Sequence, residues 1–397
     1  MQEKLIILLS GIKIRKYDIS RFDIEEFQSL PGHKIEIHEL IDYLHPGFSS
    51  VFTNTYRDKR IKSFFDFKKW TERLSYLKKK YKNNILILNE IPIVNFRSLK
   101  VNFFLKKKDI KVMRYSNNHP VYRSKISTKK ILLRFREFLS LKKITLVAKN
   151  YITRAIAKKL KLFPDYTVIQ GRNDIYNFNK NTQGKLILGH SYDYNMYLKN
   201  KKKTFLRKNN YGLFLEAPTP VHNEGDSFIM EEDYMGTRKK WLKSVNNFFN
   251  FIEEEMNIKI LIAPHPKIKY KKKFTKLYNG REVVEHNLSQ TAKKAKLIIS
   301  RDSSGFSYAS IYNIPAIFIY TDELKNNTKF LARQAYIASK LGVNPINIDN
   351  KISKSKLKSV LQFNKKIYKE YVNKYLTTRN DNKKNFEIIN EQTNNKN

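Results

Sequence analysis

Side chains that can stabilise negative charge follow an apolar run in the second half of the chain. His265 lies between Pro264 and Pro266, directly after the apolar run at 259–263, and Lys267 comes next. The two prolines restrict the backbone on both sides of the imidazole. A hydrogen-bond-donating histidine beside a lysine is suited to stabilising the charge that grows on a departing phosphate. The pattern therefore predicts phosphate chemistry, with a purely structural histidine as the alternative.

A second segment, at 300–307, joins a predicted strand to a predicted helix through small hydroxyl residues and a glycine. Small residues at a helix N-terminus expose backbone N–H groups, and the helix dipole favours anions there. The residues predicted to bind a phosphate here are Arg301, Ser303, Ser304 and Gly305. The alternative is that Asp302 or Ser303 only caps the helix. The segment lacks the glycine and lysine spacing of a P-loop, so nucleotide hydrolysis of that type is not predicted.

A third segment places carboxylates in a turn that proline stiffens. Glu216 ends the apolar run at 211–215, and His222 and Asp226 follow as further candidates for a binding cleft. A carboxylate in this position can accept hydrogen bonds from ribose hydroxyls or act as a base toward an acceptor hydroxyl. A turn with helix-capping acids is the alternative interpretation.

Other chemistries find no support in the sequence. It has no histidine, aspartate and glutamate cluster with metal-ligand spacing and no G-x-S-x-G nucleophile elbow. We therefore expect a reaction that needs neither a metal ion nor a cofactor.

The elements that must position these residues alternate between short apolar runs and helical patterns. Strand-length runs lie at 5–9, 85–88, 144–148, 167–169 and 186–188 in the first half, and at 211–216, 259–263, 297–300 and 316–320 in the second. Strands that alternate with helices predict mostly parallel sheets covered on both faces, hence an α/β fold. Ligands bind such sheets at the carboxyl ends of the strands, where the candidate residues stand.

The charged segment at 199–210 interrupts the alternating pattern and predicts a linker. We expect a first domain at 1–205 and a second at 206–350, each Rossmann-like. An amphipathic helix at 351–376 is expected to pack back across both domains. The polar, asparagine-rich segment at 377–397 is expected to be disordered.

The charge of the chain limits the classes of binding partner, and its cysteine content bears on the cellular compartment. The 397 residues include 78 Lys and Arg against 36 Asp and Glu, a formal charge of +42, and no cysteine. An AT-rich coding sequence can account for part of the lysine excess, and among binding partners the excess favours an anionic membrane surface. Nucleic acid is not expected, because no organised recognition motif is present. With no apolar run of membrane-spanning length, we expect a cytoplasmic protein, peripheral on the inner membrane face.

Motif order gives the chain a resemblance to a bacterial enzyme group. The motifs are Phe214-Leu-Glu216 with a following proline and histidine, Ala263-Pro-His-Pro266, Ser303-Ser304 before small residues, and Ile314-Pro-Ala-Ile-Phe-Ile319, with a weaker match at Gly189–Asn195. Together they resemble the GT-B glycosyltransferases of capsule and lipopolysaccharide assembly, such as Kdo transferases and sialyl- and polysialyltransferases with their HP and S motifs. The resemblance covers residues 166–323 and implies two facing Rossmann-like domains.

The resemblance also implies roles. The HP histidine and the S-motif serine contact the donor phosphate in that group, which would make His265 a phosphate ligand or leaving-group acid, with Ser303 or Ser304 as its partner. The first domain would bind a glycan or lipid-linked acceptor, and the second a nucleotide-sugar donor of the CMP-nonulosonate or Kdo type. The sialyltransferases carry their base in a paired-acid and glycine motif that this first half lacks. Glu90, Asp193 and Glu216 are therefore the candidates for the base.

Two other functions stay open at this point. The same motifs resemble the CDP-glycerol polyolphosphate transferases, in which the phosphate moves to the acceptor together with the polyol. The basic composition would also suit a non-catalytic module that binds a glycan or a lipid.

Overall fold

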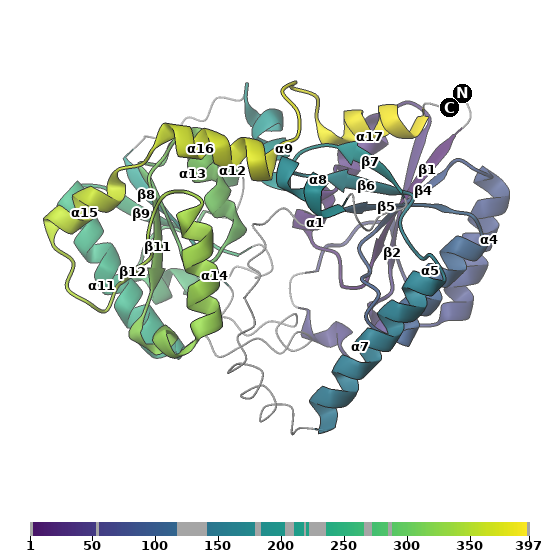
Figure 1. Cartoon of the computed structure of the whole chain (residues 1–397), viewed down its shortest axis with the longest axis horizontal. Coiled ribbons are helices and arrows are strands. Elements are labelled where there is room, and N and C mark those ends of the chain that lie inside the picture. Colours follow the sequence, from purple (N-terminus) through teal and green to yellow (C-terminus); the bar gives the residue numbers. More distant parts are fainter. Residues whose placement is uncertain are drawn as a thin grey trace.

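The computed structural model describes residues 3–52, 55–116, 141–178, 184–202, 210–217, 220–221, 236–265, 272–284 and 288–394. Figure 1 shows two α/β domains, each built on its own sheet. Every pairing between neighbouring strands in the two sheets is parallel. The predicted fold class, two Rossmann-like domains of GT-B type, is confirmed.

The first sheet has seven strands in the order β3-β2-β1-β4-β5-β6-β7. The strands are β1 (Lys4–Ser10), β2 (His33–Glu39), β3 (Ile61–Ser63), β4 (Ile85–Asn89), β5 (Lys111–Tyr115), β6 (Tyr166–Ile169) and β7 (Lys185–Leu188). Its helices are α1 (Lys16–Arg21), α2 (Ile24–Ser29), α3 (Ile41–Leu44), α4 (Phe67–Tyr81), α5 (Phe96–Lys107), α7 (Leu141–Lys159), α8 (Arg172–Phe178) and α9 (Tyr192–Asn200). Strand β1 is an unbroken apolar run at 5–9 because helices cover both faces of the sheet.

The second sheet has five strands in the order β12-β11-β10-β8-β9. The strands are β8 (Tyr211–Leu215), β9 (Lys259–Ala263), β10 (Leu297–Ser300), β11 (Ala316–Tyr320) and β12 (Ile346–Asn347). The helices are α11 (Arg238–Met256), α12 (Leu288–Lys293), α13 (Ser307–Tyr312), α14 (Thr328–Ser339) and α15 (Lys354–Leu361), with 3-10 turns η2 (Lys272–Tyr278), η3 (Ser304–Phe306) and η4 (Asp322–Asn326). Helix α11 buries Trp241, Val245 and Phe249 against this sheet, as its helical spacing predicts.

One predicted strand is wrong. The apolar run at 144–148 belongs to helix α7, and the fifth position of the first sheet is taken by β5 at 111–115. A five-residue apolar run does not distinguish a strand from part of a helix, because periodicity needs a longer window. Strand β2 was not predicted either, since its His-Lys-Ile-Glu-Ile-His-Glu sequence is half polar.

The C-terminal crossing is confirmed, although it is not one helix. Helix α15 ends at Leu361, and α16 (Lys365–Tyr371) begins anew where the Asn364 side chain accepts from the backbone N–H groups of Lys366 and Ile367. A π-helical turn, η5 (Val372–Leu376), then reaches the first domain (Figure 1). Gly171 permits that approach, because a Cβ there would lie 2.6 Å from the Tyr375 backbone. The boundary predicted near residue 205 lies outside the described residues.

The disorder expected for 377–397 is wrong for its described part. Residues Asn385–Asn394 form helix α17, which returns to the first sheet. Ile388 and Ile389 are buried there among the side chains around β1, and the Phe386 ring meets Phe27 edge-on. These apolar contacts hold a helix in a segment that is otherwise polar.

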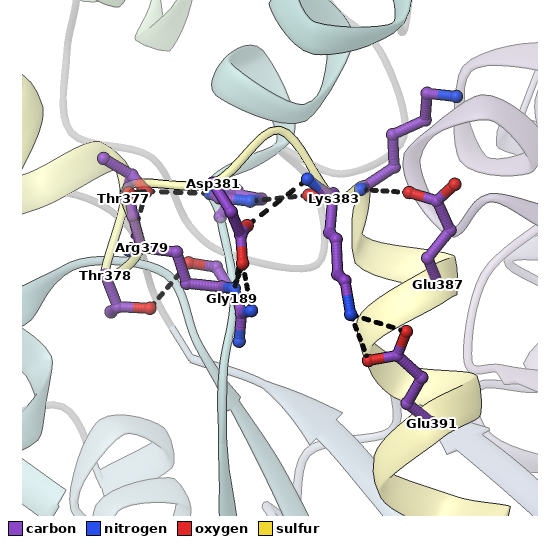
Figure 2. A network of polar contacts seen from close by, with 10 residues as sticks. Gly189, Thr377, Thr378, Arg379, Asp381, Lys383, Glu387 and Glu391 are labelled. Carbon is purple, nitrogen blue, oxygen red and sulfur yellow. Dashed lines mark hydrogen bonds and ion pairs between the residues drawn. The ribbon is translucent and has the colours of Figure 1, made fainter.

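Polar contacts fix the path between η5 and α17 (Figure 2). The Gly189 carbonyl accepts from the backbone N–H and the hydroxyl of Thr378, at 3.1 and 2.9 Å. The buried His190 ring bonds the Thr377 hydroxyl at 2.8 Å and the Lys383 carbonyl at 2.9 Å. Burial lowers the pKa of His190 to about 4, so this ring is neutral at physiological pH. The Gly189-His190 pair therefore anchors the C-terminal segment.

Replacing Ile389 by Ala tests this packing. The side chain is 0% exposed, so its truncation leaves a cavity and should lower the free energy of unfolding by about 2–5 kcal/mol. Urea unfolding followed by circular dichroism measures the loss. Gln392→Ala, on the same helix, should change stability by less than about 0.5 kcal/mol. Equal stability of both variants would contradict the packing of α17.

Candidate functional site

Strand register brings three of the predicted segments to one edge of the second sheet. Leu215, the last residue of β8, pairs with Ala263 of β9 and with Ser300 of β10. The residues that follow these strands are therefore neighbours, and the Glu216 backbone N–H donates to the Ala263 carbonyl at 2.9 Å. This edge is the carboxyl end of a parallel sheet, the place where such sheets bind ligands.

His265 is a half-buried residue two positions after β9. The loop that carries it begins next to Glu216, since Leu215 pairs with Ala263. Lys267, predicted to bind the donor phosphate, lies outside the described residues, as do the cleft candidates His222 and Asp226.

Arg301 supplies a buried positive charge after β10. Its guanidinium lies 5.5 Å from the Trp241 ring centroid and 5.7 Å from that of Phe330, and its Nε donates to the Asp302 carboxylate at 3.0 Å. The Gln334 amide fixes the backbone by donating to the Arg301 carbonyl at 2.6 Å. Because this charge lies below the surface, water screens it weakly.

The Ser303-Ser304 turn exposes hydroxyl groups at the same edge. Ser303 is half-buried and Ser304 is exposed, and the Ser303 backbone N–H donates to the Ser300 hydroxyl at 3.1 Å. The Ser303 side chain makes no capping hydrogen bond to η3, so simple capping does not account for it. Gly305 has a different reason to be glycine, because a Cβ there would come within 2.9 Å of the Leu288 side chain. Close packing therefore favours glycine at this position, although a shift of the Leu288 methyl group would make room for a Cβ.

Glu216 is buried and accepts a hydrogen bond from the Tyr278 hydroxyl. Burial, together with the nearby Glu216 carboxylate, raises the pKa of Tyr278 well above its ordinary value, so Tyr278 remains a donor at physiological pH. Arg301 lies close enough to offset part of that effect. Glu216 therefore fixes the position of Tyr278 below the sheet edge. Its own carboxylate is buried and is not accessible to an acceptor molecule.

Asp193 lies at the contact between the domains. It is buried in the first turn of α9 and accepts from the Ser307 hydroxyl of α13 at 2.5 Å, with the Tyr308 side chain as a further hydrogen-bond partner. Burial raises the pKa of Asp193 to about 6, against the partial opposition of these hydrogen bonds. Its carboxylate joins the first domain to the helix that follows the Ser303-Ser304 turn.

Glu90 is the candidate carboxylate that reaches solvent. It follows β4 at the carboxyl edge of the first sheet, its side chain is 27% exposed, and one oxygen lies 3.8 Å from Arg21 Nη2. Burial raises the pKa of Glu90, while Arg21 and Arg114 act in the opposite direction. A partly solvated carboxylate with a raised pKa is suited to accept a proton from a hydroxyl.

Sequence reasoning missed Arg21, Arg114 and Tyr278. Arg21 ends a six-residue helix, and Tyr278 ends a 3-10 turn, so neither belongs to a recognisable motif. The position of Arg114 at the end of β5 was not predicted because β5 itself was not. Arg114 Nη2 donates to the Ile91 carbonyl at 2.6 Å, which fixes the loop directly after Glu90.

A hollow of about 340 Å³ lies at the carboxyl edge of the second sheet, next to the residues that follow β11 and β12. It is lined in part by Lys240, Lys243, Asp322, Glu323 and Asp349. A larger hollow of about 400 Å³ lies between β12 and α15, away from the candidate residues, so the smaller one is the more relevant to the site. Within the described residues, no group of three histidine, aspartate or glutamate side chains can hold a metal ion.

Comparisons with known proteins identify the fold. No family model matches this chain, and no curated protein matches it in sequence. A Listeria monocytogenes protein described as a UDP-N-acetylglucosamine 2-epimerase has a TM-score of 0.51 at 9% identity, covering 100% of this chain and 98% of its own. The Staphylococcus aureus MnaA structure with UDP has a TM-score of 0.50 at 11% identity, covering 98% and 96%. MurG of Acinetobacter baumannii has a TM-score of 0.41 at 10% identity, covering 94% of each chain. Identities this low establish the two-domain fold alone.

Replacing Asp193 by Asn should flatten the dependence of stability on pH. The pKa of Asp193 in the folded state, about 6, lies above its ordinary 3.8. Between these values the folded state keeps a proton that the unfolded state has released, so stability falls as pH rises through this window. The shift corresponds to a change of up to about 3 kcal/mol, which the D193N variant should lack. Urea unfolding from pH 4.5 to 7.5 measures it.

Asp23 provides an internal reference for that experiment. It is also buried, with its pKa raised to about 6 by burial, and it titrates in both proteins. The informative quantity is therefore the difference between the two curves. Parallel curves for the wild type and the variant would show that Asp193 does not titrate in this window.

Proposed function

We propose that this protein transfers a sugar from a nucleotide-activated donor to a surface-polysaccharide or lipid-linked acceptor, without a metal ion. The observation that carries the proposal is the register of β8, β9 and β10, which brings His265, Arg301 and the Ser303-Ser304 turn to one sheet edge. A histidine, a buried cation and exposed hydroxyls at that edge suit the phosphate of a nucleotide. In this proposal residues 206–350 bind the donor, residues 1–205 bind the acceptor, and the reaction takes place on the cytoplasmic side of the membrane.

The donor phosphate is stabilised by three kinds of group. His265 donates a hydrogen bond to the phosphate as it leaves, and Ser303 and Ser304 offer their hydroxyl groups as donors. Arg301 lies below the surface between the Trp241 and Phe330 rings, and its ion pair with Asp302 holds the guanidinium at this edge, where it can turn toward the phosphate. Such groups accelerate transfer because they interact more strongly with the transition state than with the intact donor.

The acceptor hydroxyl is activated by Glu90. As the acceptor oxygen forms a bond to the anomeric carbon, its proton passes to Glu90. The bond from that carbon to the phosphate oxygen breaks, and its electron pair leaves with the nucleotide. Glu216 and Asp193 are less suited to this role, because Tyr278 and Ser307 respectively hydrogen-bond their buried carboxylates.

The motifs Ala263-Pro-His-Pro266 and Ser303-Ser304 favour a donor of the CMP-nonulosonate or Kdo type. The Staphylococcus aureus structure of similar fold contains UDP, so uridine nucleotides belong among the candidates. A CDP-glycerol donor, with transfer of the polyol phosphate, would use the same phosphate-binding residues. An experiment must therefore determine the nucleobase of the donor and the group that is transferred.

Nucleotide binding provides the first test. We expect one of CMP, UDP, GDP or CDP-glycerol to raise the melting temperature, because a ligand that binds only the folded state stabilises it. His265→Ala should lose most of that rise and lower donor turnover by about 100-fold or more. His33→Ala is the matched control, since His33 begins β2 at the opposite end of its strand from the cleft.

The outcomes separate the candidate functions. A response to CDP-glycerol alone would replace sugar transfer by polyol phosphate transfer. No response to any of the four would contradict a nucleotide-dependent enzyme and favour a binding module. Conversion of UDP-N-acetylglucosamine to its 2-epimer without an acceptor would replace transfer by epimerisation.

Replacing Glu90 by Gln tests the base. The variant should bind the donor with an unchanged rise in melting temperature, while its turnover falls by about 100- to 10,000-fold. The wild-type rate should rise with pH as Glu90 loses its proton, and the variant should lack this limb of the profile. Glu72→Gln, an exposed carboxylate on α4, is the control and should behave as the wild type. Full activity in E90Q would remove Glu90 from the mechanism.

A further inference from the structure

Exposed apolar side chains are distributed unequally between the two domains. Among the described residues, every large apolar side chain that is exposed lies at or before Leu188, in the first domain. The set comprises Phe48, Phe65, Tyr76, Phe96, Phe103, Tyr151, Ile152, Leu160 and Leu188. Helices α5 and α7, with the residue directly after α7, carry more than half of it. Exposed apolar side chains concentrated on two neighbouring helices are typical of a surface that binds a protein or a membrane.

Helices α5 and α7 are also basic without any acidic residue. Their sequences, Phe96–Lys107 and Leu141–Lys159, contain lysines and arginines but no aspartate or glutamate. The two helices contact one another, and Figure 1 shows them beside α4 on the first domain. We call their exposed residues, together with Leu160 directly after α7, the α5–α7 face.

On α5, exposed phenylalanines and lysines alternate along one side of the helix. Phe96 is 55% exposed and Phe103 is 45% exposed, with exposed Lys100 and Lys107 spaced between and after them. On α7, Tyr151 is 74% exposed and Ile152 is 52% exposed, and Arg154, Lys158 and Lys159 are exposed nearby. None of these five cations forms an ion pair with a carboxylate among the described residues. The face thus combines apolar groups with positive charges that no carboxylate of the described residues pairs.

We propose that the α5–α7 face binds the surface of an anionic lipid bilayer. Aromatic and aliphatic side chains enter the boundary between headgroups and acyl chains, while lysines and arginines contact anionic headgroups. No helix among the described residues is long and apolar enough to cross a membrane, so this contact would be interfacial. The aliphatic Ile152 and Leu160 distinguish the face from one built for nucleic acid, where aromatic rings stack on bases and aliphatic groups have no such role.

The position of the face fits the proposed acceptor site. Helix α5 begins six residues after Glu90, which follows β4 at the carboxyl edge of the first sheet. A bilayer in contact with Phe96 would therefore lie beside the loop that carries the proposed base. This consequence, a membrane-held acceptor, rests on the proposed function. The binding itself depends only on the α5–α7 face.

Vesicle flotation tests the inference, with full-length protein and no nucleotide. The wild type should bind vesicles of phosphatidylcholine with about 30% phosphatidylserine and should bind pure phosphatidylcholine weakly. An apolar variant, F96A/F103A/Y151A/I152A, should lose about tenfold or more in affinity. A charge variant, K100Q/K107Q/K158Q/K159Q, should lose at least as much, because each lysine near such a surface contributes about 1 kcal/mol.

The matched control removes four lysines elsewhere. K356Q/K358Q/K365Q/K366Q takes the same charge from exposed positions on α15 and α16, and it should bind within about twofold of the wild type. An equal loss in this control would overturn the inference, because net charge alone would then explain binding. Unchanged binding of the apolar variant would also overturn it, as would tighter binding of the face to RNA than to vesicles.

Failure here is distinguishable from failure of the proposed function. The face variants keep the second domain intact, so their melting temperature should still rise with the nucleotide that stabilises the wild type. Loss of vesicle binding with that response retained supports the inference. If no nucleotide stabilises the wild type, flotation still decides whether the α5–α7 face binds lipid.

Discussion

The pairing of β8 with both β9 and β10 is the constraint on which the candidate donor site depends. Leu215 pairs with Ala263 on one side and with Ser300 on the other, so the chain leaves all three strands at one level. Glu216, His265 and Arg301 belong to segments far apart in the sequence, and only this register makes them neighbours. A shift of one residue would move each side chain to the opposite face of its strand. The buried apolar residues of these strands therefore position the polar ones.

The relation between the domains depends on the contact of Asp193 with Ser307 and on the returning C-terminal segment. Asp193 bonds the helix that follows the Ser303-Ser304 turn, while η5 packs close to Gly171 of the first domain. Both connections attach to elements next to the candidate donor site. A change in the angle between the domains would therefore alter the Asp193–Ser307 contact, which lies next to that turn.

Much of the fold could be predicted from the sequence, because parallel strands buried on both faces are continuous apolar runs. This holds for β1, β8 and β9, and it also placed His265 and the Ser303-Ser304 turn after strands. The partners of the carboxylates could not be predicted. Burial of Glu216 by Tyr278 and of Asp193 by Ser307 depends on contacts across 62 and 114 residues of sequence. The packing of α17 depends likewise on the distant residues around β1.

The positive charge of the chain has more than one physical role. Elsewhere in both domains, cations pair with carboxylates: Lys13 with Glu39 at 3.0 Å, Arg281 with Glu253 at 2.6 Å, and Lys354 with Glu255 at 3.0 Å. On α5 and α7 the helices supply no acid at all, and exposed aromatic rings stand among the lysines. A mutational bias toward lysine would raise the charge of both regions alike, but it would not place the exposed apolar side chains on one domain. The coincidence of charge and apolar exposure is therefore the feature of this surface that composition alone leaves unexplained.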